Sequence, residues 1–320
     1  ALAQAPDAAG FFSTRVAVPN ATSAVPVLAV PNALAAELLG GGDVRATFRV
    51  DAALELVDTV NVIATTRSGA NDSVVLVGAH LDSVPAGPGV NDDGSGSAAV
   101  LELALQMARD RVALKSQVRF AWWGAEELGL LGSRYHVEHA PADDRARWVA
   151  YLNNDMLGST NYNQYVMRVD NASTVVPERA RRGSDAITAL YADYFERQQL
   201  PYVHNVVDAP GSSDYGYFLL ADIAAGAVAS GAGVIKTQRQ LELFGGIKGA
   251  ATDPCYHKAC DDTDNISPVA LQNNARALAD VLQHIALADD ARALIYGNDD
   301  GVNGTAAAAA AGLTAVRHSL

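Results

Sequence analysis

Cysteine and positive charge are scarce in this sequence, and long apolar runs are missing. With only two cysteines, a chain of 320 residues cannot depend on a disulfide framework, and the pair does not form a zinc-finger pattern. Lys and Arg number 23 against 36 Asp and Glu, so the net charge of −13 argues against nucleic acids and anionic membrane surfaces as partners. No apolar run approaches the roughly 20 residues that cross a bilayer, so we expect no membrane-spanning segment.

What the sequence does contain is enough apolar material for a core. Hydrophobic residues make up 49% of the chain and charged residues 18%, which excludes global disorder and suits one large domain with an appendage. We expect three regions: a segment over residues 1–55, a main domain over 56–297, and a low-complexity tail over 298–320. The chain begins with Ala1 rather than methionine, so we expect a processed product.

The main domain alternates between strand and helix patterns. Apolar, β-branched runs predict strands over residues 59–65, 73–80, 117–123, 148–153 and 223–229. Apolar residues at helical spacing predict helices over residues 94–110, 128–139, 184–198 and 267–288. Ser267 before Pro268 supplies an N-cap followed by proline at the first helical position. This alternation indicates an α/β sandwich around a mostly parallel sheet.

Acidic and imidazole side chains follow the predicted strands or precede the last helix. Because ligands of open α/β sheets bind beyond the carboxyl ends of the strands, these side chains are candidates for one site. Each alone has an ordinary explanation as a structural histidine, a turn or a helix start. Together, such carboxylates would repel one another and require a multivalent cation. The residues are His80, Asp82, Asp92, Asp93, Glu126, Glu127, Asp155 and His257.

The types of side chain indicate which metal such a site would hold. Two imidazoles with three carboxylates and no thiolate suit zinc, cobalt or manganese better than calcium or magnesium. Five ligands are too many for one tetrahedral ion with an open position, and they suit two ions that share a bridging carboxylate. In an extended segment, Glu126 and Glu127 would point to opposite sides, so one could bind metal while the other serves as general base.

Five short segments carry these residues. They are His80-Leu-Asp82, Gly89-Val-Asn-Asp-Asp-Gly-Ser-Gly96, Trp122-Trp-Gly-Ala-Glu-Glu-Leu-Gly129, Asn154-Asp-Met156 and Cys255-Tyr-His-Lys-Ala-Cys260. In their order and spacing they closely resemble the secreted di-zinc aminopeptidases of the leucyl-aminopeptidase type, over about residues 57–290. The resemblance implies a three-layer α/β/α sandwich with a mixed, mostly parallel central sheet.

The resemblance also implies a ligand set for two zinc ions per chain. His80 and Asp155 would bind one ion, Glu127 and His257 would bind the other, and Asp92 would bridge both. In that family the peptide bond after the bridging aspartate is cis, so the same is expected after Asp92.

Three further residues receive roles from the same resemblance. Glu126 would be the general base, and Asp82 would be the carboxylate that orients His80. Tyr256 would donate its phenol to the oxyanion of the tetrahedral intermediate. A metal-bridged hydroxide would attack the peptide carbonyl, and Glu126 would pass the proton to the leaving amine.

The resemblance implies an extracellular location. In that context we expect Cys255 and Cys260 to form a disulfide rather than two free thiols. Glycosylation sequons would permit modification in a eukaryotic host, although a couple are expected by chance. They begin at Asn20, Asn71, Asn171, Asn265 and Asn303.

The expected activity is the removal of N-terminal, preferably large hydrophobic residues from peptide substrates. Ser212 stands where relatives often carry arginine, which argues against a carboxypeptidase, and the presence of both histidines argues against a single-zinc glutaminyl cyclase. The alternative from another class is an extracellular binding or assembly protein that uses a peptidase fold, although no expected ligand is missing. Candidate substrate-pocket residues are Ser212, Asp214, Gly231 and Ala232.

Residues 1–55 resemble the closing part of a protease-associated domain. The pattern predicts strands over residues 25–30 and 44–50 with a helix over residues 31–39 between them. The apolar density of residues 25–30 predicts that this segment packs against something. We expect a small subdomain beside the metal rim that narrows substrate entry; the other interpretation is the remainder of a longer precursor.

Overall fold

A computed structural model describes residues 32–40, 45 and 57–297. The chain divides into two compact units, one of residues 1–58 with 315–320 and one of residues 59–314. In the first unit, helix α1 (Asn32–Gly40) confirms the helix that was predicted there. The predicted strands over residues 25–30 and 44–50, and the tail from residue 298, lie outside the described residues, so the lid-like subdomain stays a prediction.

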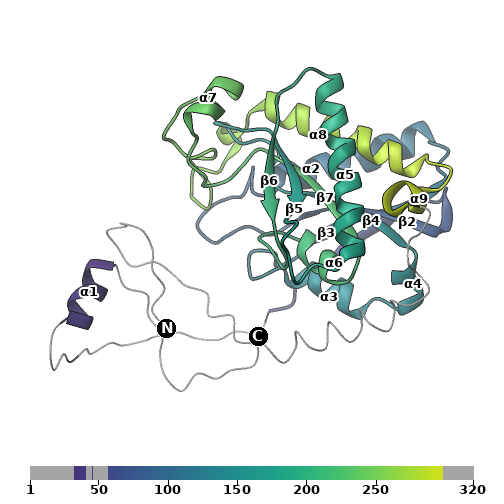
Figure 1. The fold of residues 1–320 in the computed structure, drawn as a ribbon, viewed down its shortest axis with the longest axis horizontal. Helices are drawn as coiled ribbons and strands as arrows, with labels where there is room; N and C mark the ends of the chain where they lie inside the picture. The colour runs from purple at the N-terminus through teal and green to yellow at the C-terminus, as the bar shows by residue number, and fades with distance from the viewer. Residues whose placement is uncertain (1–31, 41–44, 46–56, 298–320) are drawn as a thin grey trace. The chain divides into compact units, whose positions relative to one another are not determined.

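The second unit is built on one mixed β-sheet. Its strands are β1 (Val62–Thr65), β2 (Ala70–His80), β3 (Ser116–Trp123), β4 (Trp148–Asn154), β5 (Tyr165–Val169), β6 (Val203–Val207) and β7 (Ala224–Ala229). Their order across the sheet is β1-β3-β2-β4-β7-β5-β6. Figure 1 labels all of these strands except β1. The four central strands β3, β2, β4 and β7 are mutually parallel, whereas β1 pairs antiparallel with β3, and β5 pairs antiparallel with β7. The expected mixed, mostly parallel sheet is therefore confirmed.

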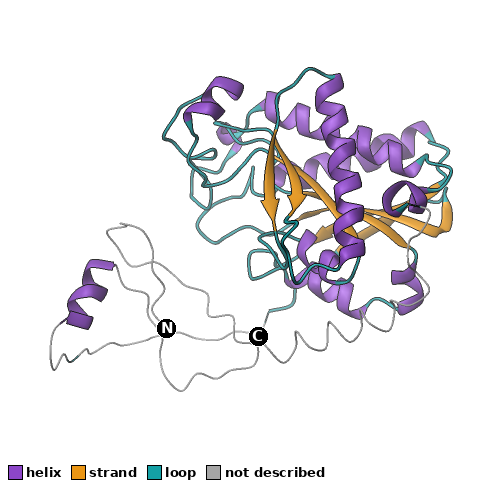
Figure 2. Cartoon of the chain, in the orientation of Figure 1, coloured by secondary structure: helices purple, strands orange, loops and turns teal. Residues whose placement is uncertain are grey.

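Helices cover both faces of this sheet (Figure 2). The helices of this unit are α2 (Gly94–Asp110), α3 (Leu131–His139), α4 (Ala142–Ala146), α5 (Glu178–Arg197), α6 (Tyr215–Leu220), α7 (Gln238–Phe244), α8 (Pro268–Ala286) and α9 (Ala291–Tyr296), of which α4 and α7 bury no residue. Residues of α2, α5, α8 and α9 pack in one hydrophobic cluster with the sheet, and residues of α3 and α6 pack in a second. The architecture is the expected α/β/α sandwich.

Strand β2 shows why the sheet must be covered on both sides. Its last seven residues are buried. Because successive side chains of a strand point to opposite faces, Val75 and Val77 join the first cluster, whereas Val74 and Leu76 join the second. The apolar run that predicted this strand thus follows from burial on both faces.

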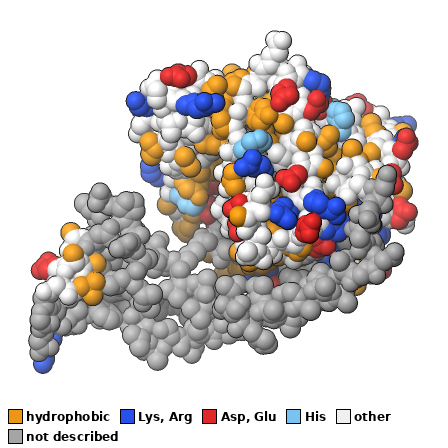
Figure 3. Space-filling view, viewed as in Figure 1, with side chains coloured by type: hydrophobic (Ala, Val, Ile, Leu, Met, Phe, Trp, Pro, Cys, Tyr) orange, Lys and Arg blue, Asp and Glu red, His pale blue; other side chains and the backbone are white. Residues whose placement is uncertain are grey.

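The helix boundaries follow local capping chemistry. The Oγ of Ser267 accepts a hydrogen bond from the backbone N–H of Ala270, and Pro268 begins α8, as predicted. Helix α5 begins at Glu178 rather than at the predicted residue 184, since Pro177 occupies its N-cap. No helix of the described residues is both long and apolar enough to span a bilayer. On the face drawn in Figure 3, acidic and basic side chains are interspersed.

Candidate metal centre and substrate pocket

The candidate site residues lie beyond the carboxyl ends of the parallel strands. His80 ends β2, and Asp155 directly follows β4. Glu126 and Glu127 follow β3 after a short turn, and Asp92 lies in the loop between β2 and α2. From β2 the chain continues to β3 on one side, whereas from the neighbouring strand β4 it continues to β5 on the other side, so the connections leave the carboxyl ends of β2 and β4 in opposite directions. Such a switch point opens the crevice where α/β sheets bind ligands.

The carboxylate of Asp92 lies between the two histidines. Its Oδ1 is 3.2 Å from Nε2 of His80, and its Oδ2 is 3.1 Å from Nε2 of His257. Asp155 Oδ1 lies 3.7 Å from the same nitrogen of His80, and Glu127 Oε1 lies 3.0 Å from that of His257. The structure therefore gathers the expected ligands into two groups that meet at Asp92. The peptide bond between Asp92 and Asp93 is cis, as the resemblance implies.

Asp93 lies close enough to His80 and Asp155 to be counted with them as a possible metal ligand. Both carboxylate oxygens of Asp93, however, already accept hydrogen bonds from the backbone. Oδ2 accepts from the backbone N–H of His80 at 3.1 Å, and Oδ1 accepts from the N–H groups of Gly96 at 3.0 Å and Met156 at 3.2 Å. Because backbone donors occupy both oxygens, Asp93 holds the ligand loops together, and Asp92 is the better candidate for a shared ligand.

The glycine at position 96 permits this packing. A Cβ atom there would lie 2.2 Å from the backbone oxygen of Asn154. The first turn of α2 can therefore approach the end of β4 only without a side chain at this position.

The two adjacent glutamates lie in a turn rather than in the extended segment that the sequence predicts. Ala125 has a φ of 57°, and the carbonyl of Glu126 accepts hydrogen bonds from Gly129 and Leu130. Their side chains nevertheless separate. Glu127 contacts His257, whereas Glu126 forms no ion pair with a histidine among the described residues. The turn thus allows one glutamate to bind metal and leaves the other available for proton transfer.

Asp82 acts on this turn and on His80 in different ways. Its carboxylate accepts hydrogen bonds from the backbone N–H groups of Glu126, at 2.9 Å, and Glu127, at 3.1 Å. Nδ1 of His80 bonds instead to the backbone carbonyl of Asp82 at 2.9 Å, while the nearer carboxylate oxygen is 3.7 Å away. The expected orientation of His80 by the Asp82 carboxylate therefore needs correction: the carbonyl orients the imidazole, and the carboxylate holds the two glutamates.

The carboxylates of the site outnumber its imidazoles, so the site has an excess of negative charge. Burial, followed by the negative charge of Asp155, raises the pKa of Glu126 from 4.5 to about 9. Burial also raises the pKa of Glu127, with Asp92 contributing in the same direction. Burial lowers the pKa of His80, but hydrogen bonds to Asp155 and Asp92 outweigh it and bring the pKa well above its usual value. Cations placed among these groups would favour their deprotonated forms.

Two buried oxygen atoms show that the site fits a metal. Oδ2 of Asp92 and Oε1 of Glu127 have no hydrogen-bond donor among the described residues, although both face Nε2 of His257. Buried polar atoms normally find a partner, and a cation between them would supply it. Nitrogen and carboxylate donors without thiolates form the donor set of catalytic zinc sites.

The predicted disulfide joins Cys255 and Cys260 in the structure. The short loop that it closes contains Tyr256 and His257, whose rings stack with centroids 3.8 Å apart. His257 has a φ of 57°, a conformation that few residues other than glycine adopt. Burial raises the pKa of the Tyr256 phenol, so its hydroxyl stays protonated and can donate a hydrogen bond.

A cavity of about 370 Å³ opens beside these groups. Of the four predicted pocket residues, Ser212, Gly231 and Ala232 line it, and Asp214 does not. Asp214 is 1% exposed, and burial raises its pKa to about 7. It lies next to Ser213, whose hydroxyl donates to Asp155 Oδ2 at 2.6 Å.

Strands β5 and β6, which the sequence patterns did not predict, contribute part of the pocket wall. The wall is largely apolar, and only the tertiary structure brings its parts together. The local signal for β5 was a short apolar segment, since four of the five residues at 165–169 are apolar. The apolar lining residues are Tyr165, Met167, Val207, Val228, Ala229 and Val234.

A β-ribbon links this pocket to the histidine loop. The N–H of Lys236 donates to the carbonyl of Ala250, and that of Thr252 donates to Val234. Lys236 is only 2% exposed, and its Nζ donates to the carbonyls of Tyr162 at 2.6 Å and Gly245 at 2.9 Å. The buried ammonium therefore anchors the ribbon that carries Val234.

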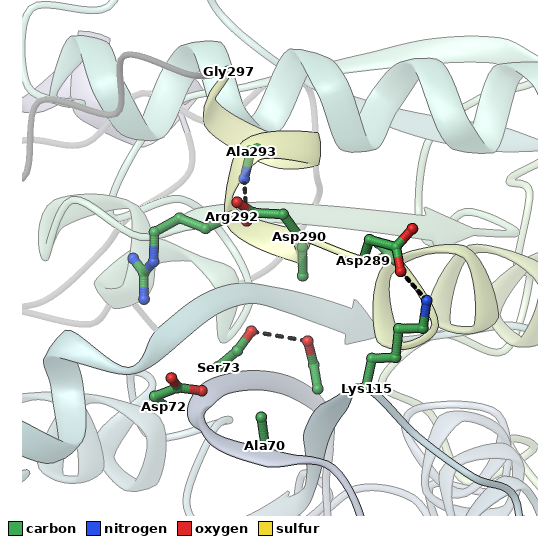
Figure 4. A pocket seen from close by; sticks show the side chains of 12 residues that line it. Ala70, Asp72, Ser73, Lys115, Asp289, Asp290, Arg292, Ala293 and Gly297 are labelled. Atoms are coloured by element: carbon green, nitrogen blue, oxygen red, sulfur yellow. Dashed lines mark hydrogen bonds and ion pairs between the residues drawn. The ribbon is translucent and has the colours of Figure 1, made fainter.

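A larger cavity of about 600 Å³ lies at the opposite, amino ends of β2 and β3 (Figure 4). Among its charged groups, Lys115 contacts Asp289. Among its neutral polar groups, the hydroxyl of Ser73 bonds to that of Ser116 at 2.8 Å. No group of potential metal ligands was found there among the described residues. Size therefore does not identify the functional cavity, and the side-chain chemistry does.

The sequon at Asn265 is buried and therefore inaccessible to glycosylation in the folded protein. Asn265 is 4% exposed and donates from its side chain to Asp253 and Asp261. The sequons at Asn71 and Asn171 are exposed, and those at Asn20 and Asn303 lie outside the described residues.

Comparison with known proteins gives a consistent result. The family described as Peptidase family M28 matches residues 61–282, which include every candidate site residue. An aminopeptidase of Pseudomonas aeruginosa is 40% identical over 245 residues, covering 77% of this chain and 45% of that protein. Leucine aminopeptidase 2 of Trichophyton equinum is 40% identical over 244 residues, covering 76% of this chain and 48% of that protein.

Solved structures agree with these relatives. A zinc aminopeptidase from Bacillus subtilis superposes with a TM-score of 0.56 and 26% identity, over 75% of this chain and 53% of that one. An aminopeptidase from Aneurinibacillus sp. strain AM-1 gives 0.54 and 28%, over 70% and 47%. The chain spans about half the length of the curated relatives it matches.

Proposed function

Because this chain belongs to peptidase family M28, we propose that it is a zinc-dependent aminopeptidase that binds two metal ions. The observation that carries this proposal is the carboxylate of Asp92, whose two oxygens lie 3.2 and 3.1 Å from two different imidazoles. One carboxylate placed in this way can serve two ions at once. His80 and Asp155 would hold the first ion, and Glu127 and His257 would hold the second.

Bound divalent ions would polarise the scissile carbonyl and make water a better nucleophile at neutral pH. The protein's own groups then account for the proton transfers. Glu126 lines the cavity and would accept a proton from the attacking water, then give it to the leaving amine. Tyr256 lines the same cavity with a protonated phenol, and it would donate a hydrogen bond to the carbonyl oxygen as charge develops there.

The arrangement favours a substrate with a free N-terminus. A protonated α-amine is attracted to the carboxylates of Glu126 and Asp155, which line the cavity. The adjoining wall of Met167, Val207 and Val228 is apolar and would favour a large hydrophobic first side chain. We further propose an extracellular location, which the disulfide between Cys255 and Cys260 supports.

The test combines zinc content with the release of leucine. Purified protein should contain two zinc equivalents and hydrolyse a leucyl substrate with a free α-amine. The same substrate with an acetylated amine should not be hydrolysed, because the cationic group is absent. Cleavage of the acetylated substrate, or full activity without metal, would contradict the proposal.

A further inference from the structure

Two metal-ligand loops that are far apart in the sequence meet at one buried carboxylate. The loop with Asp92 follows β2, and the loop with His257 precedes α8. Asp261 lies on the second loop, 170 positions after Asn91, and is only 2% exposed. It has no assigned part in metal binding.

Asp261 accepts hydrogen bonds from three consecutive residues of the first loop. Its backbone carbonyl accepts from the N–H of Val90 at 3.0 Å. Its Oδ1 accepts from the N–H of Asn91 at 3.0 Å, and its Oδ2 accepts from the N–H of Asp92 at 3.1 Å. One residue thus fixes the backbone of the segment that presents the shared ligand.

A second buried carboxylate reinforces the junction. Asp253 precedes the disulfide loop, and its Oδ2 accepts from the side-chain amide of Asn91 at 2.6 Å. The side-chain amide of Asn265 donates to Asp261 Oδ1 at 2.9 Å and to both oxygens of Asp253, at 3.0 and 3.1 Å. The hydrogen-bond donors to these two carboxylates are amide and backbone N–H groups, which have fixed directions.

We infer that Asp261 is a positioning residue that sets the place of the Asp92 carboxylate relative to His257. The inference rests on the proposed two-metal function, because only a shared ligand requires Asp92 to be placed against two imidazoles. The backbone of Asp92 is held by Asp261, and the backbone of His257 lies four residues before Asp261 on the same short loop. A shift of either loop would change both half-sites together.

The sharpest variant is Asp261→Asn, which keeps the size of the side chain. One carboxylate oxygen becomes an NH2 group, and either orientation then places a donor against a backbone N–H. Partners of metal ligands commonly change metal affinity or activity by about 10- to 100-fold when mutated. We expect the zinc affinity of this variant to decrease by about 10- to 100-fold, and its kcat to decrease as well. The KM should change little, because the apolar pocket wall comes from β5, β6 and β7.

Two control variants separate positioning from loss of charge or stability. Asp262→Asn makes the same chemical change at the exposed neighbouring residue. Asp222→Asn changes another buried carboxylate that accepts a backbone N–H, that of Ala180 at 3.0 Å, at the start of α5. We expect Asp222→Asn to lower Tm while zinc affinity stays at the wild-type level.

The measurement is the zinc dissociation constant, from competition with a chromophoric chelator at a temperature where every variant is folded. Asn265→Ser provides a milder change if Asp261→Asn does not fold, and it should weaken zinc binding in the same direction. The inference is overturned if the folded Asp261 variant, or in its absence the Asn265 variant, binds zinc as tightly as Asp262→Asn does. It is equally overturned if Asp222→Asn loses as much affinity. The wild type tests the proposed function separately, through its own zinc content and leucine release.

Discussion

Replacing Glu126 with glutamine distinguishes proton transfer from metal binding. Glutamine keeps the size of the side chain but cannot accept a proton at neutral pH. Glu126 is 8% exposed and lines the cavity of about 370 Å³, so the shape of the site should be preserved. Loss of a general base commonly costs about 10²- to 10⁴-fold in rate, which corresponds to about 3 to 5 kcal/mol of transition-state stabilisation.

The assay is kcat and KM for a leucyl substrate, measured together with zinc content by mass spectrometry. Glu126→Gln should retain the zinc content of the wild type while kcat falls. Glu127→Gln is the matched control, because it makes the same change one residue later. Since Glu127 Oε1 lies 3.0 Å from His257 Nε2, this variant should lose zinc affinity as well as activity. Loss of a zinc equivalent from Glu126→Gln, or wild-type kcat, would refute the assigned roles.

Four further results are expected. In metal-free protein, the pKa of Glu126 is raised to about 9 and that of His80 is also raised, so the folded state binds protons more tightly than the unfolded state. The Tm of the metal-free protein should therefore fall as the pH rises from about 5 to about 9. A Tm that does not change over this range would contradict the expectation. Zinc binding at pH 7 should release protons, which calorimetry in buffers of different ionisation enthalpy measures. Ala229→Phe should fill part of the pocket and lower kcat/KM for a leucyl substrate roughly tenfold or more, with a smaller loss for an alanyl substrate; equal losses would exclude Ala229 from the side-chain pocket. Lys236→Met leaves the carbonyls of Tyr162 and Gly245 without their hydrogen-bond donor. The free energy of unfolding, measured with denaturant, should fall by about 1 to 3 kcal/mol, and KM should rise more than kcat falls. An unchanged free energy of unfolding would show that the Lys236 ammonium does not anchor the ribbon that carries Val234.

Several features of the fold could be predicted because their physical causes are local. The apolar run of β2 reflects burial on both faces, and Ser267 with Pro268 sets the start of α8 through hydrogen bonding within one turn. The helix α1 was predicted in the same way, from a helical pattern that ends at glycine. Strands β5 and β6 were not predicted, since they are short and their burial depends on neighbours elsewhere in the chain.

For the candidate site, too, local features could be predicted from the sequence, whereas features that depend on distant segments could not. The sequence by itself determined which side chains follow the strands, because polar groups after buried parallel strands must meet at one edge of the sheet. It also indicated the disulfide, from two cysteines that flank Tyr256 and His257 in a short segment.

Only the tertiary structure decided how those side chains are held. The Asp82 carboxylate bonds to the turn of Glu126 and Glu127, whereas its carbonyl orients His80. Asp261 reaches a loop 170 positions away, and no local periodicity encodes a hydrogen bond over that separation. Residue types and short-range spacing therefore specified the chemistry of the site, and packing between distant segments specified its geometry.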